Sequence, residues 1–316
     1  MMDSLLDAVL SVAVYAGAIR IATPLLLAAI GEMVTERSGV LNLGIEGQIT
    51  FGAFISFFVT DQTGSLWVGL LAAIIGGALA GFLMAFVVST VKVDQVVAGL
   101  SMNLVLIGIS FFWYRSVFTS KASTTIFTVE TFSFIQVPGL EKIPIAGEIF
   151  FTQHWLTYMA VLACIGTWFG LNRTRYGLEL RSVGHNPEAC DMRGINIPKA
   201  QYLATVFGGV MSALAGSFLS LGVTGMFFPD IAAGRGWIAL AIVIFGNWRI
   251  GRIIIGALFF GFLEALQLAL QARGVDLPYQ LLLGLPFALT IVALVMNRHR
   301  SNEPMSLAVP YHRGQR

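Results

Sequence analysis

Charged side chains are scarce in this chain of 316 residues: they account for 11% of it, whereas hydrophobic residues account for 56%. A soluble globular domain is about one quarter charged, so the shortage excludes that class. The net charge of +2 is spread over several loops, and without a basic face we expect no nucleic acid as a partner. Since a membrane span needs about 20 apolar residues, the composition predicts an all-α polytopic membrane protein in contact with the lipid bilayer.

Cysteine and catalytic motifs are also in short supply. The two cysteines, Cys164 and Cys190, do not have the spacing of a metal site, and a disulfide between them is not expected on a cytoplasmic face. The sequence has no HExxH motif, no GxSxG motif in a suitable context and no GxxxxGKS/T phosphate loop. We therefore predict a chain that is not an enzyme and has no catalytic residue, metal or cofactor of its own. If the chain serves active transport, the energy would have to come from another subunit or from an ion gradient.

Apolar blocks are what the sequence has in abundance, and we interpret nine of them as transmembrane helices, within a range of eight to ten. Basic residues gather in alternate gaps, which predicts an N-terminus outside and a C-terminus in the cytoplasm. Residues 1–7 contain no Lys or Arg, so the first block is expected to remain as a span and not to be cleaved as a signal peptide. The blocks are residues 8–30, 41–59, 66–91, 96–113, 155–171, 200–221, 236–245, 253–270 and 279–295.

Three polar segments interrupt this single membrane domain of residues 1–316. The predicted topology makes them a cytoplasmic loop at 172–199, an extracytoplasmic loop at 115–152 and a basic cytoplasmic tail at 297–316. The alternation TFSFIQV in the extracytoplasmic loop favours a short strand or an interfacial piece. Runs of small residues at 76–82 and 208–218 predict close contacts between helices.

The cytoplasmic loop contains the signals of one short helix. It has an Asn N-cap, a Pro at the first helical position and a Gly stop, and we expect its two acids at the positive end of the helix dipole and its arginine at the negative end. A helix of about two turns does not persist alone in water, so it is expected to dock on a partner; the alternative is a solvated loop that only joins two spans. These residues are Asn186, Pro187, Glu188, Asp191, Arg193 and Gly194.

Two of the apolar blocks are interrupted. Residues 39–47 include Asn42, Glu46 and three glycines, which is a poor continuous helix but suits a broken one that lines a cavity. The block at 236–245 is short and follows FPDIAAGRG at 228–236, so half a span with a re-entrant piece is expected there. Polar interruptions at corresponding places in two halves of a chain are typical of a translocation site.

Ionisable residues inside apolar blocks cost a few kcal/mol each at the bilayer centre and so usually face protein or water. Glu32 is expected at a cytoplasmic end. For Arg20 and Glu264, pairing between helices is the favoured explanation. Glu46 has two interpretations that the sequence leaves open: a contact in a translocation path, or a structural cap of the broken helix.

Three stretches resemble a known family: ERSGVLNLGIEGQITFGAF at 36–54, RYGLELRSVGHNPEACDMRGI at 175–195, and the apolar, glycine-rich pattern at 237–264. Over residues 23–295 the chain resembles the permease subunits of bacterial ABC importers, in the branch that serves simple sugars, branched-chain amino acids and nucleosides. The first stretch is most similar to the nucleoside type, because in sugar permeases an Asp and a Ser usually follow the glycines.

The resemblance implies a type II-like ABC importer permease that forms half of a heterodimeric pore in the bacterial cytoplasmic membrane. It also implies three partners: an ATP-binding subunit, a second homologous permease and an extracytoplasmic substrate-binding protein. The short helix would be the coupling element that inserts into a groove of the ATPase, and the broken segment would lie beside the translocation path. The residues carried over are, for coupling, Gly184, Asn186, Pro187, Glu188, Ala189, Arg193 and Gly194, and, for the path, Asn42, Gly44, Glu46 and Gly47.

Nucleosides are the expected substrates, and simple sugars such as ribose or galactose are the alternative. Cys190 and Asp191 stand where the family commonly has small residues, and these departures leave that choice open. A more distant alternative is a secondary carrier that moves protons through Glu46 or Glu264, which would need a proton gradient and no partner ATPase. A membrane enzyme would need a cluster of His, Asp or Glu at the membrane interface, and the sequence does not suggest one.

Overall fold

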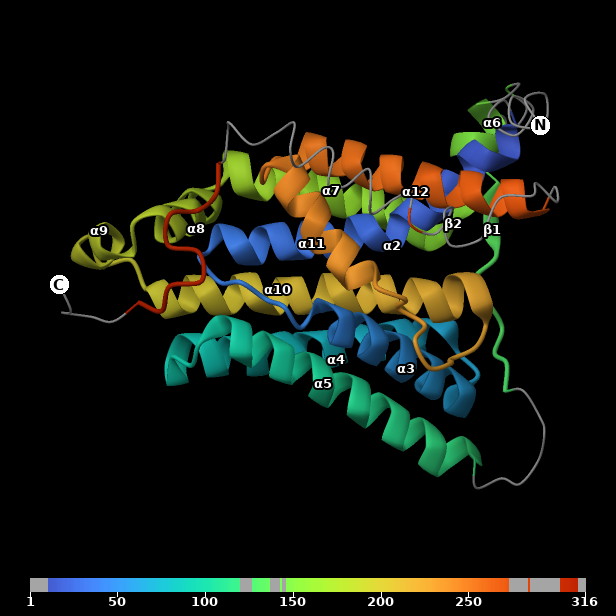
Figure 1. Ribbon diagram of the computed structural model, residues 1–316, viewed down its shortest axis with the longest axis horizontal. Helices are drawn as coiled ribbons and strands as arrows, with labels where there is room; N and C mark the ends of the chain where they lie inside the picture. Colours follow the sequence, from blue (N-terminus) through green and yellow to red (C-terminus); the bar gives the residue numbers. More distant parts are fainter. Residues whose placement is uncertain are drawn as a thin grey trace.

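The computed structural model describes residues 11–119, 127–136, 143, 146–272, 284 and 302–311. Over these residues the chain forms an elongated bundle whose long helices run roughly along one axis (Figure 1). Three π-helical segments, η1, η2 and η3, continue α4, α5 and α10. The elements are α2 (Val12–Arg37), α3 (Ile45–Thr63), α4 (Leu66–Ala85), η1 (Phe86–Val91), α5 (Gln95–Tyr114), η2 (Arg115–Thr119), β1 (Phe134–Gln136), α6 (Ala146–Phe150), β2 (Thr152–His154), α7 (Trp155–Arg173), α8 (Arg175–His185), α9 (Pro187–Met192), α10 (Ile197–Ser217), η3 (Phe218–Thr224), α11 (Arg235–Gly246) and α12 (Ile250–Ala272).

Each of the first eight predicted apolar blocks coincides with a helix, and the ninth, at 279–295, lies outside the described residues apart from Gly284. The part of the chain that is described contains six helices long and apolar enough to cross a membrane, so the prediction of a mainly helical, multi-pass membrane protein is confirmed. The count of nine spans stays a prediction. The six are Val12–Arg37, Leu66–Val91, Gln95–Phe118, Trp155–Arg173, Ile197–Thr224 and Ile250–Ala272.

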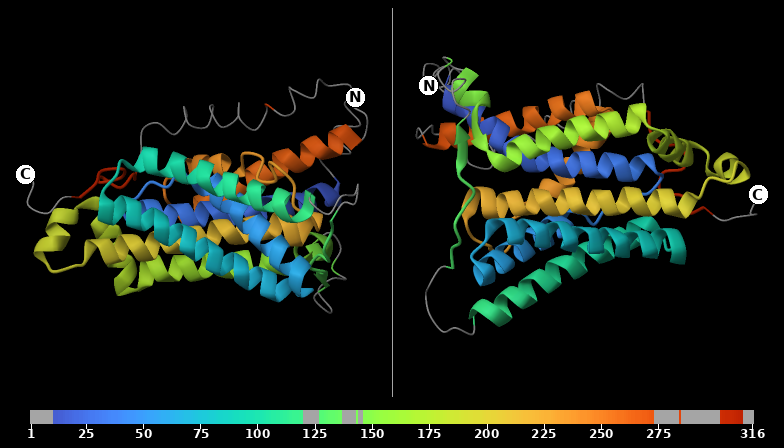
Figure 2. Two further views of the ribbon diagram at one scale, coloured as in Figure 1. Left: turned by 90° about the horizontal axis from the view of Figure 1, so that it is seen from below. Right: turned by 180° about the vertical axis from the view of Figure 1, so that it is seen from behind.

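Two helices, α2 and α10, form the centre of the bundle. They pack on each other; α10 also contacts α3 and α4, and α2 also contacts α7, α11 and α12, as the views in Figure 2 make visible. The contact between α4 and α10 is close because both faces are made of small residues: a Cβ on Gly77 would lie 2.5 Å from both the Gly209 carbonyl oxygen and the Ala213 Cβ. The predicted contacts between the small-residue runs at 76–82 and 208–218 are therefore confirmed.

The strands lie at the end of the bundle where α2 begins (Figure 1). β1 and β2 form an antiparallel pair in which Phe134 is opposite His154 and Gln136 is opposite Thr152. The short strand expected within TFSFIQV is thus present as β1.

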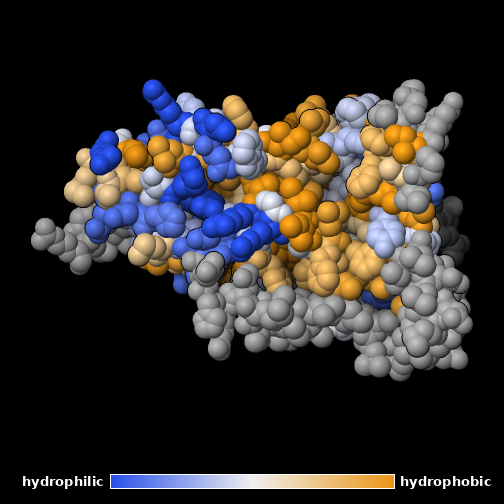
Figure 3. All heavy atoms as spheres, turned by 90° about the horizontal axis from the view of Figure 1, so that it is seen from above, coloured by the Kyte–Doolittle hydropathy of each residue, from blue (hydrophilic) through white to orange (hydrophobic). Residues whose placement is uncertain are grey.

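The opposite end of the bundle carries α8, α9 and the segment 302–311, drawn in red in Figure 1. In the view of Figure 3, hydrophilic side chains gather toward this end, while hydrophobic side chains dominate the surface farther along the molecule. A hydrophobic surface on a helical bundle suits lipid, and a polar end suits water. The helices α8 and α9 therefore lie at a water-facing end of a membrane-embedded bundle.

Candidate functional site

Two helices, α3 and α11, begin part-way along the bundle instead of at one of its ends (Figure 1). The starts of the two helices meet at Glu46, in the first turn of α3. Its carboxylate accepts the backbone N–H of Gly234 at 2.7 Å and that of Gly236 at 2.6 Å, both at the start of α11. The first amides of a helix lack partners within the helix and form its positive end. Glu46 is thus a cap, but it caps α11 and not the broken helix that was expected. A contact in the translocation path stays a prediction.

Gly236 makes this junction possible. A Cβ at that position would lie 2.6 Å from the backbone nitrogen of Glu46 and 2.8 Å from its Oε2. Any larger residue would push the start of α11 away from the carboxylate. The block at 236–245 forms a short apolar helix, α11, of 12 residues. That it is half a span with a re-entrant piece stays a prediction.

The backbone between α2 and α3 is irregular and buried, as expected for a broken helix. Asn42, which is fully buried, holds it in place: its backbone N–H donates to Glu32 Oε1 at 3.0 Å, its side-chain amide donates to Gln48 Oε1 at 3.1 Å, and its Oδ1 accepts the Gly44 N–H at 3.0 Å. Non-helical backbone at membrane depth is tolerated only where protein or water satisfies it. Here side chains provide the hydrogen bonds that the irregular backbone needs.

Gly44 and Gly47 allow the start of α3 to lie directly against α5. A Cβ on Gly44 would lie 3.2 Å from the Gly99 carbonyl oxygen, and one on Gly47 would lie 2.7 Å from the Asn103 carbonyl oxygen. The Gly47 N–H also donates to Asn103 Oδ1. The structure thus brings together the four residues predicted for the translocation path, within one buried polar junction of α2, α3, α5 and α11.

An ion pair lies next to this junction. Arg235, the first residue of α11, contacts Glu264 of α12 at 2.7 Å. Pairing between helices is therefore confirmed for Glu264. Arg20 instead donates to the Ala16 carbonyl oxygen and lies over the Phe134 ring. Both arginines line a cavity of about 770 Å³ between α2, η3 and α12.

The predicted short helix is present as α9. The Asn186 side chain accepts the Ala189 N–H at 3.0 Å, Pro187 is the first helical residue and Gly194 has a φ of +78°. One part of the prediction is wrong: Asp191 lies in the last turn and not at the positive end. Because the helix has only six residues, its fifth residue already belongs to the C-terminal turn, where Asp191 Oδ2 accepts a hydrogen bond from the hydroxyl of Tyr311.

Gly184 ties the end of α8 to the rest of the bundle. Its carbonyl oxygen accepts the Ser306 N–H at 3.0 Å and the Ser306 hydroxyl at 2.6 Å. A Cβ on Gly184 would overlap the Arg37 carbonyl oxygen at the end of α2 and would come within 3.3 Å of the Gly39 nitrogen. The segment 302–311, α8 and the start of the irregular backbone therefore form one packed unit.

The outward face of α9 is open. Asn186, Glu188 and Arg193 are exposed, and the Met192 side chain is 83% exposed. Cys190 points inward instead, and burial raises the pKa of its thiol. The residues predicted for coupling thus divide into an exposed set on α9 and a buried anchor, Gly184.

Comparison with known proteins identifies the family of the chain. The family described as "Branched-chain amino acid transport system / permease component" matches residues 14–294. The chain belongs to this permease family. No solved structure matches the chain significantly.

Relatives within this permease family are similar over most of their length. The guanosine ABC transporter permease protein NupQ of Bacillus subtilis (strain 168) is 35% identical over 304 residues, which cover 93% of this chain and 95% of NupQ. The nucleoside ABC transporter permease protein NupC of Lactococcus lactis subsp. cremoris is 33% identical, with 92% and 93% covered. TsgC13 of Haloferax volcanii, whose name assigns it provisionally to glucose transport, is 39% identical, with 82% and 78% covered.

Sequence reasoning missed three residues of the permease: one in the buried junction, one beside it and one at the water-facing end. Asn103 is a single amide in the apolar block 96–113, and such an isolated polar residue is a usable signal. Arg235 lies in the stretch FPDIAAGRG, which was interpreted only as a re-entrant piece before the short block at 236–245. Ser306 offers no such signal, since it stands in a polar tail far from Gly184 in the sequence.

Proposed function

We propose that this permease is the nucleoside-translocating subunit of an ATP-driven importer and forms half of a heterodimeric pore. The main support for this function is a continuous series of contacts from the exposed helix α9 to Glu46. It runs from α9 through Gly184 to Arg37 and Gly39, and from there along the buried segment to the start of α3. Such a line can convert movement at a water-facing surface into movement inside the bundle.

Coupling follows from the rigidity of each link. A partner that grips the exposed face of α9 moves α8, because Asn186 is both the last cap of α8 and the first cap of α9. Gly184 cannot move far without moving the Arg37 carbonyl, since the two backbones are in contact. Displacement of the segment after Arg37 shifts Glu46, which holds the start of α11. Opening and closing of this junction would gate the path beside Asn42, Gly44, Glu46 and Gly47.

The partners follow from the family. ATP and Mg²⁺ would be bound by an ATP-binding subunit that contacts α9, and an extracytoplasmic protein would deliver the substrate. A second permease is supported by Bacillus subtilis, which has both NupQ and NupP, a guanosine ABC transporter permease protein 28% identical to this chain over 255 residues. The proposed fold is type II-like and has nine spans, with the N-terminus outside and the C-terminus in the cytoplasm of a bacterium. In this topology residues 172–199 are the coupling loop, residues 115–152 lie outside and residues 297–316 form the cytoplasmic tail.

Nucleosides are favoured over simple sugars because two relatives with nucleoside or guanosine in their names align over more than nine tenths of this chain. TsgC13, the relative provisionally assigned to glucose, aligns over a shorter part of it. A proton-driven carrier is disfavoured because both candidate carboxylates are engaged by donors: Glu46 by two backbone amides and Glu264 by Arg235.

Reconstitution tests the proposal. We expect the tagged chain, purified in mild detergent, to retain an ATP-binding subunit and a second permease, both identifiable by mass spectrometry. In proteoliposomes, uptake of radiolabelled guanosine should require both partners and ATP, and excess unlabelled adenosine or cytidine should compete where ribose should not. Uptake by the chain alone, driven by a proton gradient, would overturn the proposal; competition by ribose alone would move the substrate to sugars.

Variants of α9 test the coupling role. Gly194→Val forces a β-branched residue into positive φ, which costs about 1–3 kcal/mol, and Asn186→Leu removes an N-cap worth about 1 kcal/mol. We expect both to lower guanosine uptake several-fold while the complex continues to hydrolyse ATP. Asp61→Ala is the control, because Asp61 lies near the C-terminal end of α3, at an exposed position where it accepts a hydrogen bond from the neighbouring Gln62 side chain. Equal loss of uptake in the control and in the α9 variants would contradict a coupling role.

A further inference from the structure

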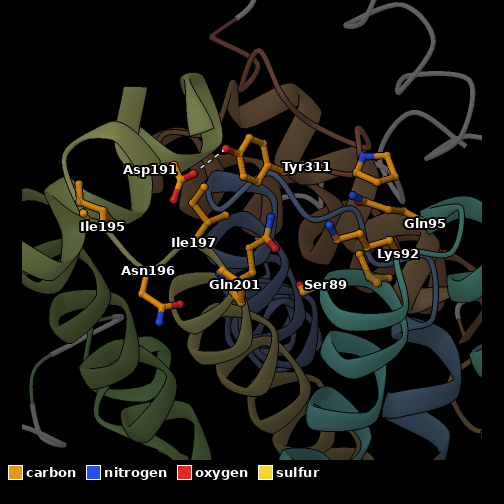
Figure 4. A pocket seen from close by; sticks show the side chains of 13 residues that line it. Ser89, Lys92, Gln95, Asp191, Ile195, Asn196, Ile197, Gln201 and Tyr311 are labelled. Atoms are coloured by element: carbon orange, nitrogen blue, oxygen red, sulfur yellow. Dashed lines mark hydrogen bonds between the residues drawn. The ribbon is translucent and has the colours of Figure 1, made fainter. Parts of the chain in front are cut away.

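A pocket of about 430 Å³ lies at the water-facing end of the bundle, beside α9 (Figure 4). Its walls come from four parts of the chain: η1 with the start of α5, the link from α9 to α10, the first turns of α10, and the segment 302–311. None of the residues predicted for the translocation path lines it. The pocket is therefore separate from that path.

Two polar side chains face each other across this pocket without a partner. Gln201 rises from α10 into the middle of the space, and Lys92 reaches toward it from the opposite wall (Figure 4). Gln201 is 8% exposed, and its side-chain amide has no hydrogen bond within the described residues. Lys92 forms no ion pair with any described acid. A buried amide without a hydrogen-bond partner loses free energy unless something else binds it. Lys92, which is half-buried, places a positive charge near that amide.

The remaining polar groups add donors on the Lys92 side. The Ser89 hydroxyl is buried in the wall beside Lys92 and has no hydrogen-bond partner among the described residues. The one carboxylate of the pocket, that of Asp191, is on the far wall, where it accepts a hydrogen bond from Tyr311 (Figure 4). The anionic group of a ligand would be attracted to Lys92 and repelled by Asp191. A bound ligand would therefore be oriented with this group on the Lys92 side of the pocket.

The pocket also lies at the membrane boundary. Lys92 follows directly after the candidate span Leu66–Val91, and Ile197 begins the candidate span Ile197–Thr224. A positively charged side chain at a membrane boundary attracts the phosphorylated headgroups of anionic lipids, and Lys92 supplies such a charge on one wall of the pocket. The volume exceeds what inorganic phosphate alone would fill, and Val88, Ile195 and Ile197 give part of the wall an apolar surface.

We propose that this pocket binds a phosphate ester, with the phosphate between Lys92 and Gln201 and the organic part against the apolar wall. The source is either the headgroup of an anionic lipid or a soluble phosphate ester, which share this chemistry. Because one wall belongs to the link after α9 and another to η1, a bound ligand would fix α9 relative to the span that ends at Val91. The site would thus set how firmly the proposed coupling helix is held.

Binding to the purified full-length chain tests the site without any transport assay. One arm measures retained lipid by native mass spectrometry, with phosphatidylglycerol compared with diacylglycerol, which lacks the phosphate. The other measures the thermal unfolding midpoint with glycerol 3-phosphate compared with glycerol. Selective binding of phosphatidylglycerol alone assigns the site to lipid, and a stabilising effect of glycerol 3-phosphate assigns it to soluble esters. Absence of both effects overturns the proposal and leaves the transport function standing.

Variants locate the binding. Lys92→Gln and Gln201→Leu should each weaken binding about tenfold or more, because each removes a hydrogen bond to a charged group. Lys92→Arg should keep it, which separates loss of charge from failure to fold. Lys199→Gln is the matched control: it removes one positive charge from the exposed first turn of α10, and Lys199 does not line the pocket. Equal weakening by Lys199→Gln and Lys92→Gln, or wild-type binding by Lys92→Gln, would refute the site.

Discussion

Replacement of Glu46 by Gln should detach the start of α11. The carboxylate accepts two backbone N–H groups, at 2.7 and 2.6 Å, and each hydrogen bond to a charged group contributes about 1.5–3 kcal/mol. The Gln side chain has one oxygen acceptor and one NH₂ donor, so it can satisfy one amide and must turn a donor toward the other. The expected loss is one charged bond, or about 2–3 kcal/mol, together with the favourable charge at the positive end of the helix.

The assay that reports this loss directly is amide hydrogen exchange of the peptide that contains Gly234 and Gly236. Since every 1.4 kcal/mol changes an equilibrium tenfold, a loss of about 2 kcal/mol should speed local exchange roughly 30-fold. Guanosine uptake by the reconstituted complex should fall with it. Glu46→Asp, which keeps the charge but is one methylene shorter, should behave like Glu46→Gln, because both amides depend on reach.

The control is Asp61→Asn, which removes a carboxylate from the other end of the same helix. Among the described residues, Asp61 accepts a side-chain hydrogen bond only from the neighbouring Gln62, at an exposed position. Exposed contacts of this kind contribute about 0–1 kcal/mol. Exchange at Gly234 and Gly236 should be unchanged in this variant. The reasoning is refuted if Glu46→Gln leaves both the exchange of these amides and the uptake at wild-type values.

Gly77→Val should lower the free energy of unfolding by about 1–3 kcal/mol, because the larger side chain would overpack against Ala213. Gly166→Val should change that free energy little, because a Cβ on Gly166 would meet no atom within 4 Å. Equal thermal unfolding midpoints for the two variants would contradict the close contact between α4 and α10. Cys190 should react with iodoacetamide more slowly than a free thiol at pH 8, because burial raises its pKa and only the thiolate reacts. The Cys164→Ala variant isolates this rate. The rate should rise as the pH rises beyond the ordinary thiol pKa of about 8.5, and alkylation at the rate of a free thiol would show that the site is open.

Local signals in the sequence were enough to predict the helices and their ends. The apolar blocks became helices because burial in lipid rewards an unbroken run of apolar residues, and α9 formed between Asn186 and Gly194 because caps act within one turn. Asp191 was misplaced because a helix of six residues leaves almost no room between its first and last turns. An error of one residue in such a helix moves a side chain to the opposite dipole end.

The partners of the buried residues could not be predicted in the same way. Glu46 was recognised as costly in a span, but its amide donors lie about 190 residues later, and no periodicity connects the two. The partner of Arg235 could not be predicted either. Its ion pair with Glu264 depends on the packing of α11 against α12. Contacts of this kind depend on how helices pack, and apolar helices in lipid can pack in several ways.

The contact between Ser306 and Gly184 has a consequence for biosynthesis. The ribosome delivers residues 302–311 after every helix from α2 to α12, so the carbonyl of Gly184 meets its partner only after all of these helices have been made. Until then the packing between α8 and the end of α2 lacks one side. Nascent chains that stop short of this segment would therefore present an incomplete water-facing end to other subunits, and assembly would select for chains that include it.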